Sequence, residues 1–307
     1  MYLGIDFGGT NLRMGKVGTG AKLLKPCTVI PSRLVAEDRR PVKALAQMIK
    51  DCLAGDSCSA VSIGMPASVS DDFCTVLQAP NVKSREGKPV FDHMPLGDLL
   101  SEELGIQVYV NKDVNNLLYY DMYSYGSRGT VIGCYIGTGI GSAVSFDGNI
   151  MYGSHGLAMD CGHISMFRVN KICGCGKAGC AETVGSGTAL ARLRAEKFPQ
   201  VGFDELYTDT DIADEMSRYL KDCAYLPAML LTVFDPDLLI LGGGVTEAAG
   251  FPRERFITEM LALTEHGIAA EPPRICWSER MPERGVIGAA IFAEKCLNQS
   301  KKGSGLK

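Results

Sequence analysis

One histidine and three cysteines within eighteen residues constrain the fold of this chain more than any other feature. They are His163, Cys173, Cys175 and Cys180, in the pattern H-x9-C-x-C-G-x-x-G-C. One His and three Cys form a common ligand set for a closed tetrahedral zinc site. Glycines between the cysteines exclude a helix and let the backbone curl toward one centre. The segment therefore predicts a structural zinc with no open coordination position.

Composition excludes several classes of function. The chain has 307 residues, of which 46% are hydrophobic and 21% charged, and a net charge of −4. This length predicts two domains. Without a basic block, nucleic-acid binding is not expected as the main activity. No apolar run reaches the length of a membrane span and no signal peptide is recognised, so we expect a cytoplasmic protein without membrane contact, with the remaining cysteines reduced.

Strands and helices alternate in both halves of the sequence, which predicts an α/β architecture of two related lobes with a cleft between them. Residues 3–17 have the order strand, glycine turn, strand, and residues 130–146 repeat it, which indicates an internal duplication. A strand is expected over residues 23–30, and disorder from Ser300 onward. The predicted lobes are residues 1–112, with a C-terminal helix at about 285–297 packing back on it, and residues 113–284, with the zinc motif at 163–180.

Three glycine-rich runs are candidate nucleotide contacts: D-F-G-G-T-N-L-R from Asp6, G-T-G-I-G from Gly137, and G-G-G from Gly242. Backbone N–H groups of such runs, and the Thr10 hydroxyl, can hold phosphate oxygens. Asp6, at a strand end, could hold a metal-bound water. Each run also has a plainer explanation, namely a tight turn for the first two and close helix–strand packing for the third.

Several acidic residues occupy positions that suit chemistry. Asp113 follows a predicted strand and opens a predicted helix, which is the crevice position of an open α/β sheet. An ordinary helix cap is the alternative, since Asp caps helices well. Asp160 and Glu182 flank the Cys/His segment, and a zinc ion would hold both rigidly nearby. With the amide of Asn81 they could bind a ligand with many hydroxyls, or they could be solvated loop residues.

Taken together in chain order, these motifs resemble the ROK family (repressor, open reading frame, kinase). The matching motifs are Asp6-x-Gly-Gly-Thr-x-x-Arg13, Gly137-Thr-Gly-x-Gly141, Gly162-His163, Cys173-x-Cys-Gly-x-x-Gly-Cys180-x-Glu182 and Leu241-Gly-Gly-Gly-Val245. The resemblance covers essentially the whole chain, and residues 64–81 and 234–245 look most like D-allose kinase. It implies a two-lobed actin-like, hexokinase-like (ribonuclease H-like) ATPase fold that closes on ATP and a hexose, usually as a homodimer.

The resemblance also implies a role for each motif residue. Asp113 would be the general base that takes the proton from the 6-hydroxyl of the sugar as this oxygen attacks the γ-phosphate. The sugar would be held by Asn81, Asp160, His163 and Glu182. The Mg-ATP phosphates would be held by Asp6, Gly8, Gly9, Thr10, Gly137 and Thr138. The adenosine would contact Gly243 and Gly244. The predicted function is thus an ATP-dependent hexose kinase that uses Mg²⁺ and a structural Zn²⁺.

Four places depart from the family pattern. Asn11 stands where many members have Lys, and Lys112 where an Asn usually precedes the catalytic Asp. Met159-Asp160 replaces the usual Gly-Glu, and Ala67 replaces a Gly. Of these, Met159, Asp160 and Ala67 lie in the expected sugar site. The hexose therefore stays open between allose, glucose and N-acetylmannosamine.

Two other classes of function compete with a kinase. A DNA-binding repressor of the family would need a helix-turn-helix before the first glycine run, and the residues before Asp6 are too few for one. A sugar-binding protein without catalysis is the other class. The presence of Asp113 argues against it.

Overall fold

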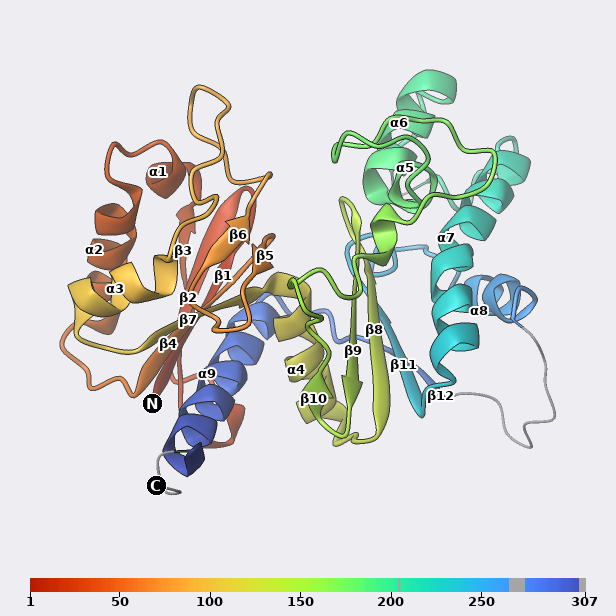
Figure 1. The fold of residues 1–307 in the computed structure, drawn as a ribbon. Coiled ribbons are helices and arrows are strands. Elements are labelled where there is room, and N and C mark those ends of the chain that lie inside the picture. Colours follow the sequence, from red (N-terminus) through yellow and green to blue (C-terminus); the bar gives the residue numbers. More distant parts are fainter. Residues whose placement is uncertain (204, 265–273, 304–307) are drawn as a thin grey trace. The chain divides into compact units, whose positions relative to one another are not determined.

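The computed structural model describes residues 1–307 except 204, 265–273 and 304–307 (Figure 1). Contacts divide the chain into two compact units. The first comprises Met1–Gly126, Tyr152–Ala158 and Met281–Lys307, and the second comprises Ser127–Met151 and Met159–Arg280. Each unit has a mixed five-stranded sheet with helices packed on it, so the predicted α/β class is confirmed.

The sheet of the first unit has the strand order β3-β2-β1-β4-β7. Its strands are β1 (Tyr2–Phe7), β2 (Asn11–Val17), β3 (Thr28–Pro31), β4 (Ala60–Met65) and β7 (Val108–Lys112). β1 and β2 form an antiparallel hairpin, while β4 runs parallel to both β1 and β7. Leu3, Ile5 and Phe7 have no exposed surface, because helices cover both faces of the sheet.

The helices of the first unit are α1 (Arg33–Ala36), α2 (Pro41–Leu53), α3 (Leu96–Leu104), α4 (Asp113–Tyr125) and α9 (Arg284–Gly303). Figure 1 shows α2 and α3 on one side of the sheet and α4 and α9 on the other. A short 3₁₀ turn, η1 (Thr19–Ala21), and a two-stranded sheet of β5 (Ser68–Val69) and β6 (Val76–Gln78) complete the unit.

The C-terminal helix α9 packs directly on β1 and on α4. A Cβ atom on Gly4 would lie 1.8 Å from the Val286 carbonyl oxygen, and one on Gly288 would lie 1.8 Å from the Asn116 carbonyl oxygen. Glycine is therefore required at both positions for this close approach. Sequence predicts a lobe boundary near residue 112, but the contacts of α4 with α9 and β4 group that helix with the first unit.

The sheet of the second unit has the order β10-β9-β8-β11-β12. Its strands are β8 (Thr130–Ile136), β9 (Ile140–Phe146), β10 (Asn149–Ile150), β11 (Leu238–Gly242) and β12 (Arg274–Trp277). Its helices are η2 (Cys161–His163), α5 (Glu182–Gly185), α6 (Gly187–Lys197), α7 (Ala213–Phe234) and α8 (Arg253–Leu261). As in the first unit, an antiparallel three-stranded meander is joined through its first strand to two parallel strands. This shared topology agrees with the internal duplication expected from sequence.

Two predicted elements differ from the structure. The strand expected over residues 23–30 is reduced to β3, because Pro26 has no N–H to donate to a ladder. Disorder from Ser300 onward is wrong for residues 300–303, since α9 continues to Gly303 and the Ser300 hydroxyl donates to the Cys296 carbonyl at 3.0 Å. The rest of that prediction, residues 304–307, lies outside the described residues. Among the described helices, none has the length and apolar character needed to cross a membrane.

Candidate active site

The first glycine run forms the turn between β1 and β2. The Gly8 N–H donates to the Asn11 carbonyl at 2.9 Å, and the Ser32 hydroxyl donates to the Gly8 carbonyl at 2.6 Å. Asp6 pairs with Arg13 across the hairpin, with 3.9 Å between Asp6 Oδ2 and Arg13 Nη1. The turn is thus fixed, and it holds a carboxylate and a guanidinium beside exposed backbone.

Three glycines predicted to contact the nucleotide are not required by the fold. A Cβ atom added to Gly9, Gly137 or Gly244 would meet nothing within 4 Å, and none of these residues has left-handed backbone. Neither packing nor conformation therefore demands glycine at these positions, whereas a ligand lying against the backbone would. Gly243 differs, since its φ is +95° and an added Cβ would lie 2.5 Å from the Ile136 carbonyl oxygen. The fold itself explains Gly243.

A cavity of about 560 Å³ in the second unit brings the second and third glycine runs together. Its lining residues are Gly137, Thr138, Gly187, Thr188, Leu190, Ala191, Phe203, Tyr207, Gly244, Val245 and Ala248. One part of the wall is glycine and threonine, and the other is aromatic and aliphatic. This size and this mixture are typical of sites for small organic ligands.

The polar part of the cavity wall is built on the start of α6. Ser186 caps this helix by accepting the Ala189 N–H at 3.2 Å. The Gly187 N–H donates to the Gly137 carbonyl at 2.8 Å, and the Thr188 hydroxyl donates to the Thr138 carbonyl at 2.8 Å. The second glycine turn is therefore anchored to a helix N-terminus, whose partial positive charge favours an anionic ligand.

Sequence reasoning missed most of the residues that line this cavity. Phe203, Tyr207 and Leu190 belong to no motif, and only the fold brings them beside Gly137. The Ser-Gly-Thr start of α6 was a usable signal, because serine is a preferred N-cap and follows the zinc segment closely.

The two carboxylates of the first unit's candidate site influence each other. Asp113 opens α4, and its Oδ1 accepts the Val114 N–H at 2.8 Å. Burial and, after it, the negative charge of Asp113 raise the pKa of Asp6 to about 6, while Arg13 and Arg284 act in the opposite direction. Asp6 and Asp113 therefore form a like-charged pair, a setting in which a bound cation is favoured.

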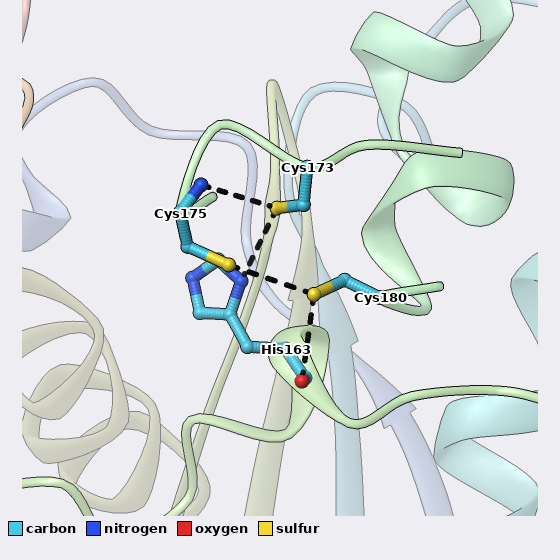
Figure 2. A group of neighbouring side chains, drawn as sticks. All are labelled: His163, Cys173, Cys175 and Cys180. Atoms are coloured by element: carbon cyan, nitrogen blue, oxygen red, sulfur yellow. Dashed lines mark hydrogen bonds between the residues drawn. The ribbon is translucent and has the colours of Figure 1, made fainter. Parts of the chain in front are cut away.

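The four candidate metal ligands converge in the second unit, as Figure 2 shows. Their ligand atoms all lie within 4.8 Å of one another, with Cys175 Sγ 3.6 Å from Cys180 Sγ and Cys173 Sγ 3.5 Å from His163 Nδ1. In tetrahedral zinc sites the bonds are about 2.3 Å to sulfur and about 2.0–2.1 Å to nitrogen. Two sulfur ligands are then about 3.8 Å apart, and a sulfur and a nitrogen ligand about 3.6 Å apart. The donor set and its spacing therefore fit a zinc ion.

The loop that carries the cysteines curls in the manner that the glycine pattern predicts. Gly176 and Gly179 have φ of +89° and +87°, a conformation that glycine adopts at little cost. The Gly176 N–H donates to the Cys173 carbonyl at 2.9 Å, and the Cys173 N–H donates to the Lys177 carbonyl at 2.8 Å. The backbone is thus shaped for the cluster by its own hydrogen bonds.

The residues predicted to bind sugar are divided between the two units. Asn81 is exposed in a turn after β6 in the first unit. Asp160, His163 and Glu182 belong to the second unit. Glu182 lies against the metal cluster, with Oε1 2.9 Å from Cys173 Sγ and 3.6 Å from His163 Nδ1. Asp160 immediately precedes η2, the 3₁₀ turn that ends at His163.

Comparisons with known proteins agree with this description. The sequence profile of the ROK family matches residues 2–296. A glucokinase of Thermotoga maritima is 26% identical over 95% of this chain and 97% of its own length, and an N-acetyl-D-glucosamine kinase of Escherichia coli is 29% identical over 95% and 99%. A ROK glucokinase of Streptomyces griseus, solved with glucose and AMPPNP, shares the fold with a TM-score of 0.79 at 24% identity, over 96% of this chain and 99% of that one. This chain has the actin-like ATPase fold of such proteins and belongs to the ROK family.

Proposed function

We propose that this protein is an ATP-dependent kinase that phosphorylates the 6-hydroxyl of a hexose. The observation that carries the proposal is that Gly9, Gly137 and Gly244 stand open where the fold itself does not require glycine. Backbone exposed in this way suits the phosphates and the ribose of a nucleotide. The similarity to named sugar kinases over nearly the whole chain supports the same activity.

The cavity of the second unit suits the nucleoside end of ATP. Its aromatic and aliphatic wall offers a flat base apolar contact, while the glycine turn anchored to the start of α6 would offer the Thr138 N–H to a phosphate oxygen. The Gly137 N–H already donates to the Gly139 carbonyl at 2.9 Å. In the first unit, Gly9 and Thr10 would hold phosphate oxygens in the same manner, and Gly8, whose N–H donates to the Asn11 carbonyl, would shape the turn. A rigid backbone arranged for charge that develops in the transition state needs no reorganisation during the reaction.

Asp113 suits the role of general base. It stands at the N-terminus of α4, where the helix dipole favours the ionised carboxylate. A sugar hydroxyl is a poor nucleophile, and a positioned carboxylate that accepts its proton accelerates transfer by about 10²–10⁴-fold. The rest of phosphoryl transfer is alignment of the reactants and neutralisation of charge.

Asp6 is the candidate residue for holding Mg²⁺ through a bound water. Its side chain is 26% exposed, and its carboxylate lies close enough to the charge of Asp113 for its pKa to rise. Both observations fit a site that a divalent cation would complete. When bound, Mg²⁺ would neutralise the phosphate charge that develops during transfer.

Replacing Asp6 with Asn should stabilise the protein at neutral pH. The pKa of Asp6 is raised to about 6, so the folded protein binds this proton more tightly than the unfolded chain does. Stability contributed by the protonated form is therefore present below about pH 4 and lost as the pH rises to about 6. Asp6→Asn removes this loss and should add about 1–3 kcal/mol to the free energy of unfolding at pH 7, with no gain at pH 4. Urea denaturation at the two pH values measures it.

Asp72→Asn is a matched control with the opposite expected sign. Burial acts to raise the pKa of Asp72, but hydrogen bonds to its carboxylate, among them those from the Cys74 and Thr75 N–H groups, leave the pKa lowered. This variant should therefore lose stability at pH 7. The raised pKa of Asp6 would not account for stability if Asp6→Asn were less stable than wild type at pH 7, or if it gained the same free energy of unfolding at both pH values.

The zinc ion is proposed to be structural. Three cysteines and one histidine leave no open position for a reacting group. The ion would fix His163 and the cysteine loop and, through the short stretch of chain from Cys180, Glu182. It would thereby hold carboxylates in place for the hydroxyls of a sugar, whose O–H groups donate strong hydrogen bonds to carboxylate oxygens.

The relatives are named for different sugars, since one is a glucokinase and another an N-acetyl-D-glucosamine kinase. The identity of the hexose therefore stays a prediction. The resemblance to D-allose kinase stays a prediction beside glucose and N-acetylmannosamine. Asp160 is one methylene shorter than the Glu usual in the family and loses about 1.5 Å of reach. The side chain of Met159 adds bulk at the neighbouring position, where the φ of +64° is one that favours glycine.

Because of these two differences, glucose is not expected to be the preferred sugar. ADP release measured with a panel of hexoses should give kcat/KM values that are higher for allose, mannose or N-acetylmannosamine than for glucose. Asp160→Glu should shift the preference back toward glucose. A wild-type protein that prefers glucose to all three would contradict this prediction, while turnover of no hexose would favour the sugar-binding protein over the kinase.

A further inference from the structure

A buried polar network lies beneath the turn that carries Asp113. Asn111, near the end of β7, is 1% exposed. Its Oδ1 accepts the Lys112 N–H at 2.9 Å and an N–H from Asn115 Nδ2 at 3.2 Å, and its Nδ2 donates to Asn116 Oδ1 at 2.7 Å. A single side chain thus ties the end of a strand to the first turn of α4.

The network continues to Tyr152. The side chain of Tyr152 hydrogen-bonds with that of Asn111, and its hydroxyl lies 3.1 Å from the hydroxyl of Tyr119. Burial is the main reason why the pKa of Tyr152 is well above its usual value, so the hydroxyl stays protonated. The ring packs edge-on against Phe73, at 4.8 Å between centroids. Tyr152 is therefore held in place by packing as well as by hydrogen bonds.

Tyr152 occupies an unusual place in the chain. It begins the segment Tyr152–Ala158, which groups with the first unit although the residues on either side of it belong to the second. A side chain from this inserted segment thus contacts the end of β7. The segment thus places a tyrosine in the network beneath the turn that carries the candidate base.

The network is not arranged for stability alone. Within the described part of the chain, the buried Nδ2 of Asn116 has no hydrogen-bond partner. It packs closely on Gly64, where an added Cβ atom would lie 2.4 Å from it. A buried polar cluster that leaves one donor unsatisfied stabilises a core less than apolar side chains of similar volume would. Such an arrangement calls for an explanation beyond packing.

We propose that Asn111 and Tyr152 are positioning residues, which fix the strand-to-helix turn so that the Asp113 carboxylate is held in one orientation. The inference rests on the proposed function, since it takes Asp113 as the base. Neither residue contacts a substrate in this account. Both act through the backbone of Lys112 and the first turn of α4.

Tyr152→Phe tests the proposal, and Tyr119→Phe is its matched control. Each variant removes one hydroxyl from the same pair of tyrosines, but only Tyr152 also hydrogen-bonds with Asn111. We expect Tyr152→Phe to lower kcat at least fivefold with an unchanged KM for ATP, and Tyr119→Phe to leave kcat within twofold of wild type. A smaller folded fraction would also lower the apparent kcat without changing KM, so the folded fraction of each variant is measured by circular dichroism and kcat is expressed per folded chain.

Amide hydrogen exchange gives a readout that does not depend on turnover. The Lys112 N–H, which donates to Asn111 Oδ1, should exchange at least tenfold faster in Tyr152→Phe than in Tyr119→Phe. Asn111→Leu removes the acceptor of this N–H and should speed its exchange further. If Asn111→Leu does not fold, the comparison of the two tyrosine variants decides whether the network fixes the turn. Equal exchange and equal kcat in the two tyrosine variants would overturn the positioning role. A wild-type protein without kinase activity would instead refute the proposed function, and the exchange rates would still decide whether the turn is fixed by this network.

Discussion

Asp113→Asn is expected to lower kcat by about 10²–10⁴-fold, because the amide has the shape of the carboxylate but cannot accept the proton of the sugar hydroxyl. The KM for ATP should change little, since the proposed role of Asp113 is at the sugar and not at the nucleotide. Coupled measurement of ADP release gives both constants. A variant that turns over as fast as wild type would remove Asp113 from the reaction.

The same variant should remain folded, which separates catalysis from stability. Asp6 and Asp113 repel each other in the folded protein, so the loss of one charge should leave the thermal midpoint at pH 7 unchanged or higher. Asp98→Asn is the matched control, because Asp98 is an exposed aspartate in the first turn of another helix, α3. It should keep kcat within about twofold of wild type, because the residue lies outside the proposed site, and surface substitutions usually change stability little.

Loss of the metal should have the largest effect on stability. Purified protein should contain about one zinc per chain by elemental analysis, and zinc in small model domains contributes about 10–16 kcal/mol of apparent folding free energy. Cys175→Ser is the most informative substitution, because Cys175 is exposed while Cys173 and Cys180 are buried. Its loss creates no cavity in the core, so destabilisation reports on the metal site.

We expect Cys175→Ser to bind less zinc, to lower the thermal midpoint by more than about 10 °C and to abolish activity, since a domain loses about 2–8 °C for each kcal/mol. Cys52→Ser, which alters a half-buried cysteine outside the cluster, should leave zinc content unchanged. Wild-type protein that is stable and free of metal would contradict the structural role of zinc.

Sequence predicted those elements whose determinants are local. Helix α3 has such a determinant at its end, because Gly105 follows it with a φ of +65° and donates its N–H to the Ser101 carbonyl. The strands on either side of both glycine turns were also foreseen, since apolar runs and glycines mark them. The convergence of His163 with the cysteines was predictable for the same reason, since their spacing in the chain is short.

Features that depend on residues distant in the chain were not predictable. Gly243 and Gly244 look alike in sequence, yet only Gly243 is explained by packing, through the carbonyl of Ile136. Phe203 and Tyr207 line the cavity because α6 and the loop after it fold over the second glycine turn. The grouping of α4 with the first unit rests on its packing against α9, some 160 residues later in the sequence.

The measurement that tests the central claim most directly is product analysis of a single reaction. Wild-type protein, Mg-ATP and a hexose panel should yield ADP and hexose 6-phosphate in equal amounts, identified by phosphorus NMR, with at least one sugar converted completely. ATP hydrolysis without a phosphorylated sugar, or no consumption of ATP with any hexose, would contradict the account.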